Sequence, residues 1–300
     1  MTDLLAHIQP ESAGPIDLSI ELNRKFLADR IKSDIDNYCA EAYDDGHRNH
    51  LGASQIGHVC SRYLFNTFRW VSHKKHTGRM QRLFNRGHRE EARFIEWLKG
   101  IGFEVKDVDD NGKQLRIISS MGHFGGSLDG QAIPPAKYNL FNELMLLEFK
   151  TQGTGSGFEK LKAEGVKKVK PVHYTQMCIY GKHYGLHFAV YCCINKNDDD
   201  LHIEVVTLDW QLAEQQEAKA TDIIFATIPP EKFAFSEAVF ECKYCDFVGI
   251  CHRGESAEKN CRSCINSVPV ANGEWRCKLY DNIIPNDFIP KGCDSWKPIV

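Results

Sequence analysis

The sequence predicts an α/β fold with a sheet at its core, and two observations lead to this prediction. Between residues 20 and 99, apolar side chains recur every three or four positions, which is the period of a helix that faces a core. Five short segments rich in β-branched and aromatic residues follow, separated by clusters of Gly, Pro, Asn and Asp. Helices first, then strands with helices between them, indicate a sheet covered by helices.

Composition and charge indicate a globular protein. Of the 300 residues, 42% are hydrophobic, and 37 basic residues against 40 acidic ones leave a net charge of −3. These values argue against a disordered, collagen-like or coiled-coil chain, and the length suits one large domain with an appendage or two modest domains. No apolar run approaches the roughly 20 residues that cross a bilayer, and the first residues do not resemble a signal peptide. We therefore expect a cytoplasmic protein without a membrane partner.

The first part of the chain is predicted to be mainly helical. Residues 1–17 are expected to form a flexible arm. Apolar periodicity predicts one helix over Ile20–Tyr43, a second that starts at Ser54, and a third from about Arg79 to Lys99. These elements define a helical N-terminal region over residues 18–110.

The sheet core is predicted over residues 111–228. The expected strands are Gln114–Ser119, His123–Ile133, Leu144–Thr151, Leu186–Ile194 and Leu201–Leu208. Helices are expected over His173–His183, between the third and fourth strands, and over Trp210–Thr227.

Two acidic residues and a lysine stand out in this core. Asp129 ends a short apolar strand in Gly-Ser-Leu-Asp-Gly, and Glu148 and Lys150 lie in Leu-Leu-Glu-Phe-Lys-Thr. Strand alternation places Glu148 and Lys150 on one face and Phe149 on the other. Carboxylates at strand ends are the hard oxygen ligands that Mg²⁺ or Mn²⁺ prefers. The alternative is a cross-strand ion pair, but charges within so apolar a segment need partners or a function.

Two helical pairs flank this group. His88 and Glu91 lie at i and i+3 on the third predicted helix, so both project from one face. Gln176 and Tyr180 lie at i and i+4 on a later helix and share a face in the same way. Taken alone, each pair is more simply explained as part of an exposed polar helix face.

In this order the motifs resemble the PD-(D/E)XK nucleases of the RecB type, over roughly Ser54 to Cys251. That superfamily includes the AddB and RecB nuclease domains and the RecB-like nucleases associated with CRISPR systems. The shared order is a helix with His and Glu, then Asp, then Glu-x-Lys, then Gln-x-x-x-Tyr. The resemblance implies a restriction-endonuclease-like mixed sheet flanked by helices, and a deoxyribonuclease that uses Mg²⁺ or Mn²⁺.

The resemblance also implies a role for each matching residue. His88, Asp129 and Glu148 would bind the metal, together with the Phe149 carbonyl. Lys150 would be the catalytic lysine, while Gln176 and Tyr180 would lie near it and the DNA. The helix-borne acid of many relatives would be Glu91, although the neighbouring Glu90 is also in reach of that place.

Twelve cysteines are the most unusual feature of the composition. Without a secretion signal, metal binding is a better explanation of clustered cysteines than disulfides. Cys39, Cys178, Cys192 and Cys193 are scattered and fit buried free thiols. Seven cysteines are close together near the C-terminus: Cys242, Cys245, Cys251, Cys261, Cys264, Cys277 and Cys293.

The first three of these cysteines require a fourth metal ligand from elsewhere. Cys242-x2-Cys245-x5-Cys251 lies in a segment over residues 229–255. Iron–sulfur nucleases of the RecB type have three such cysteines after the core and one before the His-bearing helix, where Cys60 stands here. The resemblance therefore implies a [4Fe–4S] cluster on Cys60, Cys242, Cys245 and Cys251. A zinc site with His252 or Cys261 as fourth ligand is the competing interpretation.

The last four cysteines lie outside the family pattern. Cys261-x2-Cys264-x12-Cys277-x15-Cys293 has the spacing of a Cys₄ zinc site. We expect a small zinc-stabilised module over residues 256–300. A second cluster, or thiols exchanged between the two sites, are the alternatives.

The expected partner is DNA, as single strands or duplex ends. Basic residues flank the motifs on both sides, at His73–Arg89 and at Lys160–Lys170, although solvated surface lysine is the simpler explanation of such segments by themselves. A non-catalytic DNA-end-binding or partner-docking protein is the main alternative, and a redox or radical enzyme is disfavoured. No phosphate-binding loop of a motor is present, so a helicase or recombination partner would be a separate protein. DNA repair, CRISPR adaptation and phage DNA metabolism, in a bacterial or phage-infected cell, all suit these features.

Overall fold

The structure is a computed structural model that describes residues 18–138, 143–153 and 155–300. The flexible arm predicted for residues 1–17 lies outside the described residues. The described residues divide into two compact units, one of residues 18–44 with 75–85 and one of residues 45–74 with those from 86 onward.

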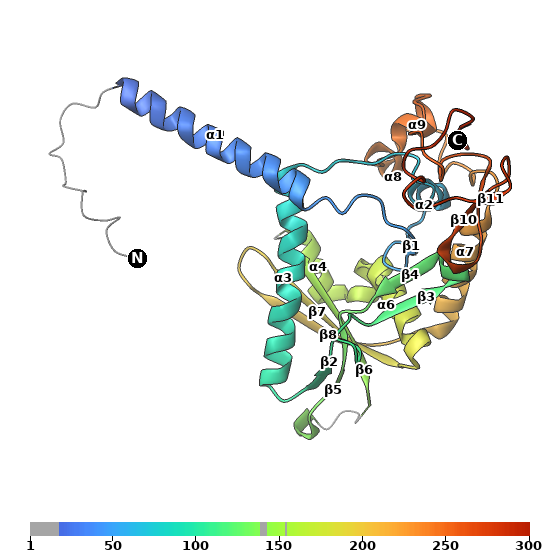
Figure 1. Cartoon of the computed structure of the whole chain (residues 1–300). Coiled ribbons are helices and arrows are strands. Elements are labelled where there is room, and N and C mark those ends of the chain that lie inside the picture. Colours follow the sequence, from blue (N-terminus) through green and yellow to red (C-terminus); the bar gives the residue numbers. More distant parts are fainter. Residues whose placement is uncertain (1–17, 139–142, 154) are drawn as a thin grey trace. The chain divides into compact units, whose positions relative to one another are not determined.

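A five-stranded mixed sheet forms the core of the larger unit (Figure 1). Its order is β2-β5-β6-β7-β8, in which β6 and β7 run parallel and the other neighbours antiparallel. The strands are β2 (Glu104–Lys106), β5 (Gly130–Ile133), β6 (Met145–Gln152), β7 (Phe188–Asn195) and β8 (Leu201–Thr207). This arrangement confirms the predicted mixed α/β architecture.

Helices cover both faces of this sheet because β6 and β7 alternate their side chains. On one face Leu146 and Tyr191 belong to the core that contains α6, and on the other Leu147 and Val190 pack with α3. The helices between α1 and the C-terminal part are α2 (Ser61–Phe68), α3 (Gly78–Gly100), α4 (Ser156–Glu164), α5 (Val166–Val169), α6 (Pro171–Tyr184) and α7 (Trp210–Phe225). The predicted third, fourth and fifth helices correspond to α3, α6 and α7.

The single strand predicted over residues 123–133 is wrong, because two strands occupy this segment. β4 (Phe124–Ser127) lies between β1 (Leu51–Gly52) and β3 (Arg116–Ser119) in a separate three-stranded sheet, whereas β5 joins the five-stranded sheet. The chain changes sheet at Leu128 and Asp129. There the Leu128 amide donates to the Leu115 carbonyl, and the Asp129 carboxylate accepts from the Phe149 amide.

The helix predicted to start at Ser54 begins later. Residues up to Cys60 form β1 and a series of turns, and α2 starts only at Ser61. Cys60 has an extended backbone, and its Sγ accepts a hydrogen bond from the Tyr63 amide at 3.3 Å. The cysteine thus caps the helix and sets its first turn.

The smaller unit contains α1 (Leu18–Ala42) and the first part of α3. The predicted apolar stripe of α1 is present but exposed, at Leu22, Phe26, Leu27, Ile31, Ile35 and Tyr38. Close to the end of α1, Arg82 pairs with Asp36 at 2.6 Å. A Cβ on Gly78 would fall 1.9 Å from the Asp36 carbonyl oxygen, so glycine permits this close backbone approach.

The C-terminal part has little regular structure. It comprises α8 (Phe240–Lys243), α9 (Val248–His252) and a small antiparallel sheet of order β11-β10-β9, formed by β9 (Ser267–Pro269), β10 (Trp275–Cys277) and β11 (Asn282–Ile283). Short 3₁₀ turns lie at Ser120–Gly122, Ala136–Tyr138 and Ala271–Gly273. In the part of the chain that the structure describes, no helix is both long and apolar enough to cross a membrane.

Candidate functional site

Asp129, Glu148 and Lys150 meet at the junction of β5 and β6. Glu148 and Lys150 project from the same face of β6, and the Lys150 Nζ donates to the Glu148 carboxylate and, at 3.2 Å, to the Phe149 carbonyl oxygen. The Asp129 Oδ2 accepts the Phe149 amide hydrogen at 2.6 Å. Glu148 is fully buried. Three groups that the sequence separates by up to 21 positions therefore share one polar cluster.

Burial disfavours the charged form of both acids in this cluster. Burial raises the pKa of Glu148 to about 8, with Lys150 opposing and Asp129 reinforcing the shift. Burial likewise raises the pKa of Asp129. For Lys150, burial alone would lower the pKa, but the Glu148 and Asp129 carboxylates outweigh it and raise it. A further cation would therefore be attracted to these carboxylates.

Gln176 and Tyr180 of α6 complete the inner wall of the cluster. The Gln176 Nε2 donates to the Glu148 Oε2 at 3.3 Å, so this oxygen is held while Lys150 engages the other. Tyr180 is 1% exposed, and burial, followed by the Glu148 and Asp129 charges, raises its pKa. Its hydroxyl lies so close to Gly126 that a Cβ there would approach it to 2.2 Å.

On α3, His88 and Glu91 lie at the rim of the cluster. The His88 Nδ1 is 3.3 Å from the Glu91 Oε1, and the His88 side chain is 74% exposed. Burial and the nearby Asp129 charge raise the pKa of Glu91. Glu90 instead pairs with two arginines of its own helix, Arg86 at 3.6 Å and Arg93 at 2.7 Å. The structure thus brings Glu91, and not Glu90, toward the acidic cluster.

His173 belongs to this site although the sequence analysis did not select it. It lies three residues before Gln176 on α6, and its Nδ1 is 3.0 Å from the Tyr191 hydroxyl. Burial, followed by the Lys150 and Lys170 charges, lowers its pKa to about 3, so the imidazole is neutral at physiological pH. The i, i+3 spacing with Gln176 was the signal that could have identified it.

The donor set fits a hard divalent ion, although the side chains as placed do not surround one. Carboxylates and a backbone carbonyl are the oxygen ligands that Mg²⁺ and Mn²⁺ prefer. Among the described residues, no three His, Cys, Asp or Glu side chains lie close enough together to hold a metal ion. In this arrangement Lys150 Nζ donates to one Glu148 oxygen and to the carbonyl of Phe149, so it occupies two of the atoms that would bind the ion.

Cys60, Cys242, Cys245 and Cys251 line one small cavity. Three of the sulfurs accept N–H hydrogen bonds: Cys60 from the Tyr63 amide at 3.3 Å, Cys245 from the Phe247 amide at 3.4 Å and Cys251 from Asn66 Nδ2 at 3.8 Å. Cys242 accepts from the backbone of Ala234. These donors favour the thiolate form that binds metal, but burial outweighs them at Cys242 and Cys245 and raises the pKa of both thiols.

Cys261, Cys264, Cys277 and Cys293 line a second cavity, of about 340 Å³. Burial raises the pKa of the Cys261 thiol to about 11, and the neighbouring Cys293, Cys264 and Cys277 reinforce the shift. The two cysteine sets therefore occupy two separate cavities, with His252 at the first. All twelve cysteines are free of disulfides.

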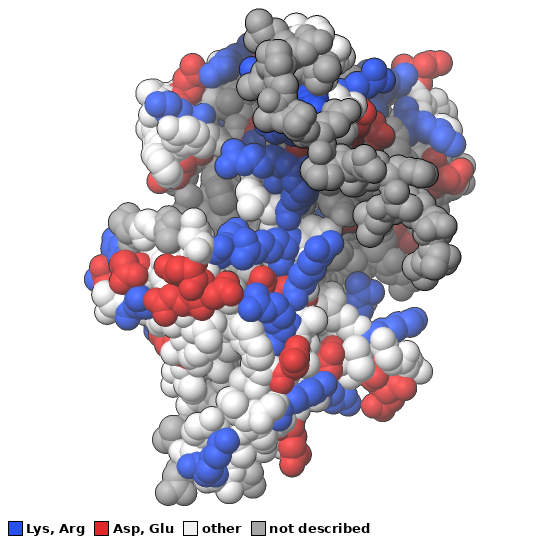
Figure 2. All heavy atoms as spheres, turned by 90° about the vertical axis from the view of Figure 1, so that its left-hand side faces the viewer, with Lys and Arg blue, Asp and Glu red and all other residues white. Residues whose placement is uncertain are grey.

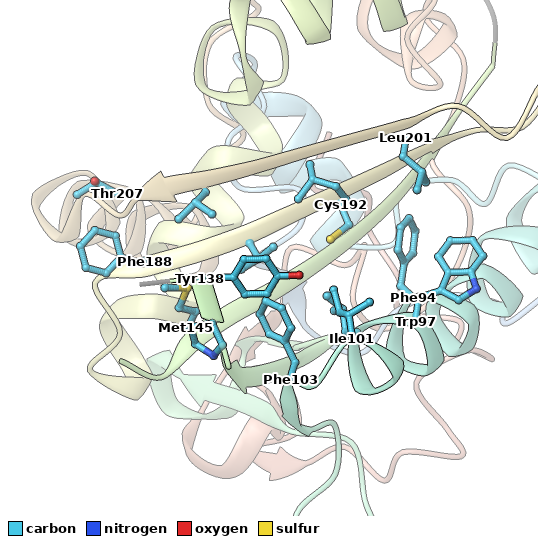
Figure 3. A pocket seen from close by; sticks show the side chains of 15 residues that line it. Phe94, Trp97, Ile101, Phe103, Tyr138, Met145, Phe188, Cys192, Leu201 and Thr207 are labelled. Atoms are coloured by element: carbon cyan, nitrogen blue, oxygen red, sulfur yellow. The ribbon is translucent and has the colours of Figure 1, made fainter. Parts of the chain in front are cut away.

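A larger hollow, of about 790 Å³, lies between α3 and the β7–β8 part of the sheet (Figure 3). Phe94 and Trp97 of α3 line it from one side, and Phe188, Cys192 and Leu201 from the sheet. Its described lining contains no carboxylate, amine or imidazole, so it offers no acidic metal ligand and no imidazole base.

Basic residues near the motifs are largely interspersed with acids. Lysine and arginine side chains lie beside acidic ones on the face shown in Figure 2. In the segment between β6 and α6, Lys162 pairs with Asp200 at 2.8 Å and Lys168 with Glu164 at 2.6 Å. Lys167 lies 5.0 Å from the Tyr174 ring centre. The basic charge available to a nucleic acid is thus smaller than the sequence alone suggests.

Comparison with known proteins gives only distant structural similarities. No protein-family model matches the sequence, and no characterised protein matches it significantly. LHK-Exo in complex with dAMP is similar at 17% identity and a TM-score of 0.42, over 58% of this chain and 86% of that one. The alkaline exonuclease LHK-Exo from Laribacter hongkongensis is similar at 17% identity and a TM-score of 0.39, over 59% of this chain and 87% of that one. SSO0001 is similar at 16% identity and a TM-score of 0.46, over 76% of this chain and 98% of that one. These similarities are too distant to assign a function.

Proposed function

We propose that this protein is a Mg²⁺- or Mn²⁺-dependent deoxyribonuclease that acts as an exonuclease on single-stranded DNA or duplex ends. The observation that carries the proposal is the convergence of Asp129, Glu148 and Lys150 around the Phe149 peptide, with Gln176 bound to Glu148. These are the residues that match the PD-(D/E)XK motifs, and segments distant in sequence supply them. A surface ion pair would not need a fully buried carboxylate.

The residues of the chain have distinct tasks in this mechanism. Asp129, Glu148 and the Phe149 carbonyl would hold the ion, with His88 and Glu91 at the rim. Such an ion lowers the pKa of its bound water and offsets the charge of the phosphate. Gln176 fixes one oxygen of Glu148 and so leaves the other for Lys150 or the ion.

Lys150 is better suited to donate than to accept a proton. The neighbouring acids raise its pKa, so it is an ammonium at neutral pH. An ammonium at this position stabilises negative charge that develops on a phosphate oxygen or on the leaving group. The neutral His173 near Lys150 adds no competing positive charge.

Variants of the three central residues test the proposal. Asp129→Ala, Glu148→Ala and Lys150→Ala should each abolish Mn²⁺-dependent degradation of end-labelled DNA, whereas Lys106→Ala, at an exposed lysine paired with Asp110, should retain it. Cleavage that survives in all three variants would remove these residues from the mechanism. Wild-type protein that binds DNA ends without turnover in Mg²⁺ or Mn²⁺ would favour the DNA-end-binding or partner-docking alternative.

We also propose that Cys60, Cys242, Cys245 and Cys251 bind a [4Fe–4S] cluster. The shared cavity and the N–H donors at all four sulfurs support this. A cluster would join the start of α2 to α8 and α9, which lie far apart in the sequence.

Iron content tests the cluster directly. Anaerobically purified protein should be brown, with about four iron atoms per chain. Cys245→Ala should remove colour and iron and lower stability. Colourless protein that contains zinc in this cavity would contradict the proposal.

A further inference from the structure

Two buried arginines, one after α2 and one in the C-terminal region, lack an acidic partner. Arg69 directly follows α2, and Arg262 lies between Cys261 and Cys264; each is 1% exposed. Among the described residues, neither guanidinium forms an ion pair with a carboxylate, and Arg69 Nε, Arg262 Nε and Arg262 Nη2 have no hydrogen-bond partner. A buried charge without a counter-charge is strongly unfavourable.

The contacts of Arg69 are directed at the cysteine-containing turn. Its Nη2 donates to the Cys264 carbonyl at 2.7 Å, and its Nη1 donates to the Ser267 carbonyl at 3.0 Å. Its guanidinium lies 5.0 Å from the Trp275 ring centre. Arg69 therefore holds the backbone that connects Cys264 to β9.

Arg262 makes the reciprocal connection from that turn to the rest of the unit. Its Nη1 donates to the Asn49 carbonyl at 3.1 Å. Its guanidinium lies 4.4 to 4.6 Å from the ring centres of Trp70, Phe68 and Trp275. Carbonyls and aromatic faces offset part of a cation's lost hydration, but they carry no net negative charge.

The last four cysteines can supply such charge next to Arg69, because Arg69 Nη2 donates to the carbonyl of one of them, Cys264. Their thiols line one cavity, and the turn that carries Cys261 and Cys264 is closed by a bond from the Cys264 amide to the Cys261 carbonyl at 3.2 Å. Cys277 ends β10 and pairs with Ser267 on β9. Strands of two and three residues form too small a sheet to be stable alone.

We propose that Cys261, Cys264, Cys277 and Cys293 bind one structural Zn²⁺, and that this centre is the counter-charge of Arg69 and Arg262. Four thiols lose four protons when they bind Zn²⁺, so the centre has a net charge of −2 against the +2 of the arginines. Zinc binding would then stabilise the module and its attachment through both arginines. The inference does not depend on nuclease activity.

Metal analysis of the full-length protein tests the assignment. We expect one zinc per chain, lost in Cys277→Ser and in Cys293→Ser while the iron content is unchanged. Cys245→Ala should show the converse, with zinc retained and iron lost. Zinc well below one per chain in the wild type, or iron that depends on Cys277, would overturn it.

The counter-charge is tested by zinc transfer to a chromogenic chelator. Arg69→Met should raise the apparent zinc dissociation constant at least about tenfold, equivalent to about 1.4 kcal/mol, and Arg69→Lys should lie between it and the wild type. Arg276→Met is the matched control, because Arg276 lies in the same module but is half exposed and pairs with Asp281. Equal zinc affinity in Arg69→Met and wild type would refute the role of the arginines.

Discussion

Replacement of Glu148 by glutamine is expected to stabilise the protein while it abolishes DNA cleavage. Glu148 is fully buried, and its pKa rises from 4.5 to about 8 on folding because burial disfavours the charged form. A raised carboxyl pKa means that the unfolded chain releases this proton more readily than the folded chain. The contribution of protonated Glu148 to the free energy of unfolding is therefore fully present below pH 4.5 and is lost as the pH rises toward 8.

The size of the effect follows from these two values. The unfolded side chain has a pKa of 4.5, which is 2.5 units below pH 7, so it is almost fully ionised at that pH. The folded side chain has a pKa of about 8 and is mainly protonated at pH 7. The linkage cost is then about 3 kcal/mol at pH 7 and about 1 kcal/mol at pH 5. Glutamine keeps an acceptor for Lys150 and a similar shape but does not ionise, so it avoids this cost.

Urea denaturation at pH 7 and pH 5, without added divalent metal, measures the difference. Glu148→Gln should exceed the wild type in free energy of unfolding by about 3 kcal/mol at pH 7, and by much less at pH 5. Glu90→Gln is the control, because Glu90 is also buried but pairs with Arg86 and Arg93. Loss of these pairs should lower the free energy of unfolding by about 1 kcal/mol. A Glu148→Gln variant that is less stable than wild type at pH 7 would show that this reasoning is wrong.

Three further predictions concern the surroundings of the site. Burial and three nearby arginines lower the pKa of His50 from 6.5 to about 4, so its contribution to stability is complete above pH 6.5 and falls as the pH drops. Solvent screens part of this effect at the half-buried His50, so at pH 5 the wild type should lose about 1 kcal/mol on this account, a loss absent from His50→Gln in urea titrations. Gly126→Ala places a Cβ against the Tyr180 hydroxyl and should lower the free energy of unfolding by about 1–3 kcal/mol. Adding Tyr180→Phe to this variant should restore part of the lost free energy, and no restoration would argue against the contact. Glu91→Gln should reduce kcat of DNA cleavage at least about tenfold while Glu90→Gln does not, and equal losses in initial-rate assays would contradict the placement of Glu91.

Local periodicity was sufficient to predict most of the regular elements. The apolar spacing of α3 and α7 predicted their positions to within a few residues, because each buries a stripe along its own length. The position of α6 was predicted as closely, although this helix is buried on all sides from Tyr174 to Gly181. Alternation along β6 placed Glu148 and Lys150 together on the face opposite Phe149, as the structure shows. Such patterns depend only on neighbours in the sequence, so they can be read without the fold.

Two errors have causes that periodicity does not contain. The segment around Asp129 belongs to two sheets, because Leu128 and Asp129 bond to Leu115 and Phe149, which lie elsewhere in the chain. The start of α2 is set by capping at Cys60 and not by apolar spacing. In both cases a hydrogen bond of a particular residue outweighed a regular pattern.

The amino-acid sequence by itself determined which acidic, basic and thiol groups this protein has and how they are spaced along each element. Only the tertiary structure decided that Glu91 and not Glu90 lies near Asp129 and that His173 lies near Lys150. It alone revealed the two buried arginines without acidic partners. The physical reason is that a pKa, an ion pair or a shared cavity depends on distances between segments that the sequence does not contain.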